Sequence, residues 1–279
     1  MARRVLVFGS LLVLLGAAFV IVSPALAEHL VFFPARSDPG PAPTLVSVRG
    51  RDVTLEAPDG VRLHAWWWDR GSEAPAVGVF HGNAGNIGGR VGLAQGLVRR
   101  GFSVLLLDYR GYGRSEGRPS EEGIYLDGQA AWDFLLDRVG TPDRVALMGR
   151  SLGGAVAIRT ATERRVGALV VEAAFTSLDE MAGAAYPFLP SFFFTRLRNR
   201  FDNLARISEV GAPVLVIHGE NDDLVPPRMG RALFGAAPEP REWYPVEGAG
   251  HNDTFAVAGP AYFDRVADFL RRFVGPASG

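Results

Sequence analysis

The 279-residue sequence contains no cysteine and no lysine, and its five histidines never occur at the spacing of a metal site. The absence of cysteine excludes disulfides, thiolate catalysis and cysteine-ligated metals. Because no H-x-x-x-H or H-E-x-x-H pair occurs, we expect neither a metal centre nor another cofactor. All 29 basic residues are arginines, which we interpret as a bias of composition and not as a sign of mechanism.

The sequence also lacks a basic block, and its formal net charge is -1. A nucleic-acid partner is therefore not expected. With 48% hydrophobic and 21% charged residues, the composition is that of a globular protein of one large domain or two small ones. Nothing in the sequence indicates an oligomeric state.

One long apolar run stands at the N-terminus, where residues 5–27 carry no charge. As a helix rising about 1.5 Å per residue, this run would reach about 34 Å, enough to cross a bilayer core of about 30 Å. A signal peptide cleaved after Ala27 is the alternative, but the apolar run before Pro24 is longer than a usual signal core of about 7–15 residues. We favour a membrane anchor, with Arg3 and Arg4 on the cytoplasmic side and the domain outside the cytoplasm.

The remaining chain divides into a spacer and a folded domain. With the anchor assigned to residues 1–28, residues 29–44 are rich in proline and glycine and are predicted to form an extended spacer. The domain is predicted over residues 45–275.

Within the domain, the pattern predicts an α/β fold with a mostly parallel sheet covered by helices on both faces. An opening hairpin is expected from residues 53–57 and 61–69. Short apolar runs then alternate with amphipathic stretches, which is typical of buried parallel strands and crossover helices. The predicted strands are 76–80, 103–108, 144–149, 167–173, 213–219 and 241–246, and the predicted helices are 88–100, 121–138, 152–163, 227–236 and 260–273.

Polar residues follow four of these strands, at the edge where parallel sheets bind ligands. His81-Gly82-Asn83 follows the first parallel strand, and Ser151 follows the strand 144–149 in the pattern G-x-S-x-G. Glycines at both flanks would let a tight strand-to-helix turn close and project Ser151 from the sheet. Asp222 and His251 follow the last two strands. We interpret Ser151 as a nucleophile, which needs a base and a group that orients the base.

The base can be chosen by elimination, because on such a turn the acid and the histidine follow the serine in the chain. Only His218 and His251 follow Ser151. His218 ends a buried strand and is expected to be structural, whereas His251 lies in a glycine-rich loop and is the favoured base. For the acid we favour Asp222, with Asp223 and Glu172 as alternatives that the sequence leaves open.

The oxyanion that forms during acyl transfer needs two N–H donors. The backbone N–H of Leu152, directly after the nucleophile, is one candidate, and that of Asn83 in the glycine-rich loop is the other. His81 is expected to hold that loop and not to act as a second base.

Four segments together resemble the membrane-anchored α/β-hydrolase-domain serine hydrolases of the bud-emergence (Bem46-like) group. They are FHGNAGNIGGR (80–90), LLLDYRGYGRSEGRPSEEG (105–123), GRSLGGAVAI (149–158) and GAGHNDT (248–254). The resemblance covers about residues 45–275 and a similar apolar N-terminus. It implies the α/β-hydrolase fold, hydrolysis of acyl esters or thioesters, and a triad that maps onto Ser151, Asp222 and His251. Residues 108–113 are then expected to scaffold the site.

A cap insertion is expected at about residues 178–210, where α/β-hydrolases often carry one. It contains an apolar cluster that either packs on the core or forms an acyl-binding wall or membrane-touching lid. The cluster consists of Tyr186, Phe188, Leu189, Phe192, Phe193 and Phe194, and Arg196, Arg198 and Arg200 follow it. The sequence thus predicts a membrane-anchored hydrolase of small or lipid-like acyl esters. A peptidase of the same fold and a catalytically idle scaffold are the alternatives.

Overall fold

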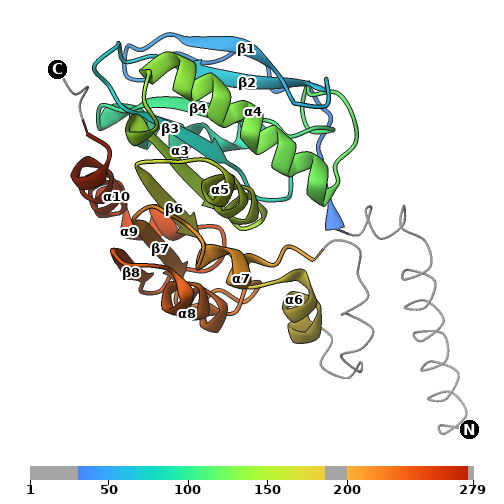
Figure 1. The fold of residues 1–279 in the computed structure, drawn as a ribbon, viewed down its shortest axis with the longest axis vertical. Helices are drawn as coiled ribbons and strands as arrows, with labels where there is room; N and C mark the ends of the chain where they lie inside the picture. Colours follow the sequence, from blue (N-terminus) through green and yellow to red (C-terminus); the bar gives the residue numbers. More distant parts are fainter. Residues whose placement is uncertain (1–30, 186–199, 276–279) are drawn as a thin grey trace, which may run out of the picture.

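The computed structural model describes residues 31–185 and 200–275, which form one eight-stranded sheet between two layers of helices (Figure 1). The strands lie in the order β1-β2-β4-β3-β5-β6-β7-β8. β1 and β2 form an antiparallel hairpin at one edge, β2 also pairs antiparallel with β4, and all other pairs are parallel. The strands are β1 (Gly50–Glu56), β2 (Arg62–Trp68), β3 (Ala76–Phe80), β4 (Ser103–Leu107), β5 (Val145–Arg150), β6 (Ala168–Glu172), β7 (Val214–Gly219) and β8 (Arg241–Val246).

The helices confirm the predicted alternation and add short elements that it did not include. The predicted helix 88–100 begins as a 3-10 turn, η1, and continues as α3. The longer helices are α3 (Val91–Arg99), α4 (Glu121–Val139), α5 (Leu152–Glu163), α8 (Pro227–Ala236) and α10 (Pro260–Phe273). The 3-10 turn η1 spans Ile87–Arg90. The unpredicted elements are η2 (Pro142–Arg144), α6 (Leu178–Ala185), α7 (Asn203–Ile207) and α9 (Thr254–Ala258).

The strands bury side chains on both faces, which explains their continuous apolar runs. In β5, Val145 and Leu147 join the core under α4, α5 and α8, whereas Ala146 and Met148 join the core under α3 and α10. The three consecutive tryptophans of β2 follow the same alternation. Trp67 packs edge-on against Phe134 of α4, while its two neighbours point to the opposite core.

Residues 31–44, which we call the strap, pack on the domain, in contrast to the predicted spacer. Phe32 is 3% exposed and contacts the ring of Phe201 edge-on. Backbone hydrogen bonds join Ala35 to Gly85 and to Gly113. A chain rich in proline is extended, as predicted, but its free carbonyl and N–H groups can still pair with neighbouring loops. The folded unit therefore begins well before residue 45.

No helix within residues 31–185 and 200–275 is long and apolar enough to cross a membrane. The predicted anchor over residues 1–28 lies outside the described residues. The apolar cluster of the predicted cap, Arg196 and Arg198 also lie outside the described residues, whereas Arg200 lies within them.

We predict that Phe32→Ala lowers the free energy of unfolding by about 3 kcal/mol, because it leaves a cavity beside Phe201. Chemical denaturation of the full chain measures this value. Phe33→Ala is the matched control, since Phe33 is 58% exposed and its loss should cost about 0.5 kcal/mol or less. Equal, small effects of both substitutions would show that the strap is a spacer after all.

Candidate active site

The turn between β5 and α5 places Ser151 at the sheet edge in a backbone conformation that few side chains adopt. Its φ of 52° and ψ of -117° lie outside the helical and extended regions. Two glycines permit this turn because α5 lies directly against the strands. A Cβ atom at Gly149 would overlap the carbonyl of Gly153, and one at Gly153 would overlap the carbonyl of Phe80. Both glycines of G-x-S-x-G are therefore required by close backbone approach.

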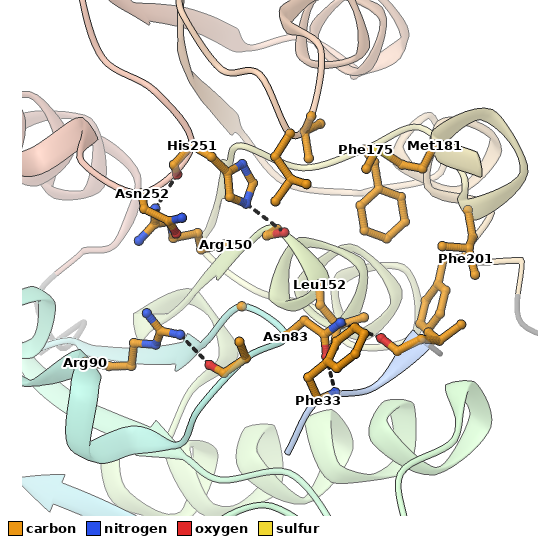
Figure 2. A pocket seen from close by; sticks show the side chains of 17 residues that line it. Phe33, Asn83, Arg90, Arg150, Leu152, Phe175, Met181, Phe201, His251 and Asn252 are labelled. Carbon is orange, nitrogen blue, oxygen red and sulfur yellow. Dashed lines mark hydrogen bonds between the residues drawn. The ribbon is translucent and has the colours of Figure 1, made fainter. Parts of the chain in front are cut away.

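Ser151, His251 and Asp222 form one chain of hydrogen bonds. His251 Nε2 lies 3.2 Å from Ser151 Oγ, and His251 Nδ1 lies 2.8 Å from Asp222 Oδ2. The carboxylate thus accepts a hydrogen bond from Nδ1–H, which leaves the Nε2 lone pair directed at the hydroxyl. The imidazole is 8% exposed and Asp222 is 4% exposed, so water has little access to the pair. In Figure 2 the ring of His251 points into the pocket, and a dashed line marks its hydrogen bond to Ser151.

Several hydrogen bonds besides that from His251 stabilise the anionic form of Asp222. Burial raises the pKa of its carboxyl, but hydrogen bonds from His218 and His251 outweigh burial, and the net pKa is well below its usual range. The N–H groups of Leu224 and Val225 also donate to Asp222 Oδ1, at 3.0 and 2.8 Å. His218 therefore has a structural role, as predicted, although its contact with Asp222 was not foreseen.

The two alternative acids lie elsewhere. Asp223 is exposed. Glu172 is buried, but it accepts hydrogen bonds from Tyr262 Oη at 2.7 Å and from Thr254 Oγ1. Of the three candidates left open by the sequence, Asp222 is the one that contacts His251.

Asn83 and Leu152, the predicted oxyanion donors, line the same pocket as Ser151. Within the described part of the chain, neither backbone N–H has a hydrogen-bond acceptor. Both polar atoms of the Asn83 side chain are engaged: its oxygen accepts from Phe33 N at 3.0 Å and from Tyr112 Oη at 2.9 Å, and its nitrogen donates to the carbonyl of Val31. The strap therefore helps to fix the loop that carries this N–H.

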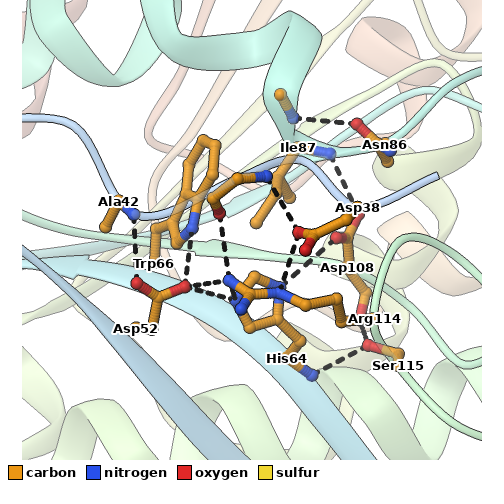
Figure 3. A network of polar contacts seen from close by, with 12 residues as sticks. Asp38, Ala42, Asp52, His64, Trp66, Asn86, Ile87, Asp108, Arg114 and Ser115 are labelled. Atoms are coloured by element: carbon orange, nitrogen blue, oxygen red, sulfur yellow. Dashed lines mark hydrogen bonds and ion pairs between the residues drawn. The ribbon is translucent and has the colours of Figure 1, made fainter.

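Residues 108–115 scaffold this loop from below (Figure 3). Asp108 Oδ1 accepts from Ile87 N at 2.9 Å, and Tyr109 Oη donates to the carbonyl of His81 at 2.8 Å. Arg114 pairs with Asp38 of the strap, at 3.3 Å, and with Asp52 of β1. Strap, hairpin and loop are thus joined by one set of polar contacts, as expected for the segment containing residues 108–113.

The pocket has a volume of about 310 Å³ and two unlike sides. In Figure 2, Phe33, Phe175, Met181 and Phe201 lie on one side of the pocket, and Arg90, Arg150 and Asn252 lie on the other. The apolar side is built by the strap, α6 and the loops around it. Its further members are Val31, Leu178, Leu224 and Val225.

Comparison with known proteins places this chain in a family. A family model described as "Serine aminopeptidase, S33" matches residues 71–205. An uncharacterized protein of Mycobacterium tuberculosis is 43% identical over 248 residues, which cover 87% of this chain and 86% of that protein. Protein bem46 of Schizosaccharomyces pombe is 32% identical, with 82% and 79% covered. A Pyrococcus furiosus esterase is similar in structure, with a TM-score of 0.74, 25% identity and 88% and 98% covered.

The chain belongs to the Bem46-like α/β-hydrolases. The four Bem46-like segments of the sequence all line the pocket or support it. They are the loop that carries Asn83, the segment that scaffolds this loop, the turn that carries Ser151 and the loop that carries His251. The pocket residues that the sequence did not indicate include Val31, Phe33, Arg90, Arg150, Phe175 and Phe201. Arg150 occupies the free position before Ser151 in G-x-S-x-G, yet nothing in the motif tells which way its side chain points.

We predict that Gly149→Ala lowers the free energy of unfolding by at least about 2 kcal/mol, because the new methyl group would overlap the backbone of α5. Thermal or chemical denaturation measures the change. The matched control is Gly235→Ala in α8, where a Cβ has open space and stability should stay constant or rise by up to about 1 kcal/mol. A tolerated Gly149→Ala would contradict the close packing of this turn.

Proposed function

We propose that this Bem46-like chain is a serine hydrolase that cleaves carboxylic esters or thioesters with an apolar acyl group. The observation that carries the proposal is the hydrogen-bonded chain Ser151–His251–Asp222 at the junction of an apolar and a polar half-pocket. A serine hydroxyl is a weak nucleophile at neutral pH, and this arrangement supplies the base that it needs.

In the proposed mechanism, Ser151 Oγ attacks the acyl carbon while its proton passes to His251 Nε2. Asp222 stabilises the resulting imidazolium without taking the proton. The N–H groups of Asn83 and Leu152 bind the oxygen that becomes negative. His251 then gives its proton to the departing oxygen or sulfur, which leaves an acyl-serine. Water deprotonated by His251 cleaves this acyl-enzyme, and the proton returns to Ser151.

The apolar half of the pocket supports an acyl chain as the group that remains on the serine. Within the described part of the chain, no carboxylate lines the 310 Å³ pocket, whereas two arginines do. An aminopeptidase must hold the positively charged amino terminus of its substrate, which two cations would repel. Esters and thioesters therefore fit this pocket better than peptides with a free amino terminus.

We also propose that residues 1–28 anchor the chain in a membrane, with the domain outside the cytoplasm. The apolar run ends at Ala27, and Val31 already lines the pocket. Four residues span at most about 14 Å, so an anchored chain would hold its pocket close to the lipid surface. This proximity favours acyl groups from lipids as substrates.

Ser151→Ala should abolish covalent labelling by a fluorophosphonate and lower kcat/KM for medium-chain esters by about ten-thousand-fold or more. A panel of octanoyl ester, thioester and amide substrates, tested with both proteins, measures the effect and the preferred bond. Ser208→Ala, at an exposed position, is the matched control and should behave as wild type. Unlabelled wild-type protein without ester turnover would favour the catalytically idle scaffold, and preferred amide cleavage would favour a peptidase.

Asp222→Asn should lower kcat/KM by about ten-thousand-fold, because an amide cannot enforce the required histidine tautomer or stabilise the imidazolium. Steady-state kinetics on the same ester measures this loss. Asp223→Asn changes the neighbouring, exposed carboxylate in the same way and should leave kcat/KM within about twofold. The reverse ranking would assign the acid to Asp223.

A further inference from the structure

Two arginines lie in the polar half of the pocket, and the hydrogen bonds of the triad involve neither of their side chains. Arg90 and Arg150 both line the main pocket, together with Asn252. A smaller cavity of about 110 Å³ adjoins it and shares Gly82, Arg90, Arg150 and Asn252 as lining. A water molecule occupies about 30 Å³ in the liquid, so this cavity has room for a group of a few heavy atoms.

The guanidinium of Arg150 has both an ion-pair partner and hydrogen-bond acceptors within the protein. Its Nε lies 3.7 Å from Glu172, and Nη2 donates to Asn252 Oδ1 at 3.2 Å and to the carbonyl of His251. These contacts neutralise its charge in part and tie it to the loop that carries the catalytic histidine.

The guanidinium of Arg90 has fewer partners than that of Arg150. It donates from Nη2 to the carbonyl of Ala84 at 2.6 Å, and its buried Nε has no partner. Within the described residues, no carboxylate lies within ion-pair distance of Arg90. Burial and the nearby Arg150 lower the pKa of Arg90, as expected for a cation that lacks a counter-ion. The cluster of Arg90, Arg150 and Glu172 therefore carries one unbalanced positive charge.

The position of Arg90 relative to the triad indicates which part of a bound substrate the guanidinium would contact. His251 must reach the leaving atom to protonate it, so the leaving group lies on the histidine side of Ser151. Arg150 and Asn252 lie next to His251, and Arg90 is on the same side, opposite the apolar residues (Figure 2). A guanidinium is well suited to bind phosphate oxygens, often through two N–H groups at once.

We infer that the site selects esters or thioesters whose leaving group carries a phosphate, which Arg90 binds while the apolar acyl chain occupies the opposite half-pocket. This inference rests on the proposed serine hydrolase function and names its substrate class. The carboxylate of an anionic leaving group shares part of this chemistry, and the experiment separates the two.

The test compares three substrates with the same octanoyl ester: 1-octanoylglycerol, 1-octanoylglycerol 3-phosphate and 3-octanoylglycerate, in which a carboxylate replaces the CH2–O–phosphate group. Octanoate release gives kcat/KM for each. Wild type should prefer the phosphate-bearing ester over the neutral one by about tenfold or more, mainly through KM. Arg90→Gln should bring the ratio close to one, and Arg90→Lys should restore part of it.

Arg165→Gln is the charge-matched control, since Arg165 pairs with Asp143 at the opposite end of the sheet and should keep the wild-type ratio. A second measurement needs no turnover. Glycerol 3-phosphate should slow fluorophosphonate labelling of Ser151 in wild type and in Arg165→Gln, but not in Arg90→Gln.

Equal kcat/KM of wild type for the neutral and phosphate esters, a preference for the carboxylate ester, or a preference that survives in Arg90→Gln would each overturn the inference. Any of these results with Ser151-dependent cleavage of 1-octanoylglycerol would leave the hydrolase proposal intact. Loss of all cleavage and all labelling in wild type would overturn both.

Discussion

The contact between α5 and the strands beneath it is the constraint on which the site depends. Because Gly149 and Gly153 carry no side chains, the first turn of the helix can lie against the ends of β3 and β5. That closeness forces Ser151 into its unusual backbone conformation and presents its hydroxyl above the sheet. It also keeps the N–H of Leu152 beside that hydroxyl. One packing requirement thus positions both the proposed nucleophile and half of the proposed oxyanion site.

The polar partners are placed by the ends of other strands, so their alignment depends on the register of the sheet. β7 leads to Asp222 and β8 leads to His251, and these strands pair in parallel from Val214 to Gly219. The buried carboxylate would be unfavourable alone, but His218 and two backbone N–H groups donate to it alongside His251. These hydrogen bonds therefore hold the carboxylate of Asp222 in place, and the carboxylate in turn orients the imidazole of His251.

The sequence was sufficient for the elements and contacts that depend on local pattern. Short apolar runs and a hairpin pattern predicted the strands, and the glycine spacing and chain order indicated Ser151 and His251. The acid stayed open among Asp222, Asp223 and Glu172. Short helices such as α7 and α9 were missed because five residues make little more than one helical turn of about 3.6 residues, too few for an apolar repeat to show. The strap and Arg90 were missed for a different reason. Proline content predicts an extended chain and arginine predicts a solvated side chain, but the surface that each one contacts is formed by segments about 50 or more residues away in the chain.

The strap connects the N-terminus to the chemistry more directly than a spacer would. Asn83 uses its side chain to hold Val31 and Phe33, and its backbone N–H is the proposed oxyanion donor. A displacement of the strap would therefore move the loop that carries Asn83. Stabilising the transition state would require this loop to be placed to within a fraction of an ångström. An anchor a few residues upstream would then orient the apolar half-pocket as well as tether the domain. With the arginines on the far side of Ser151, an acyl chain and a charged leaving group would enter in only one direction, which is the arrangement that a hydrolase working at a lipid–water boundary needs.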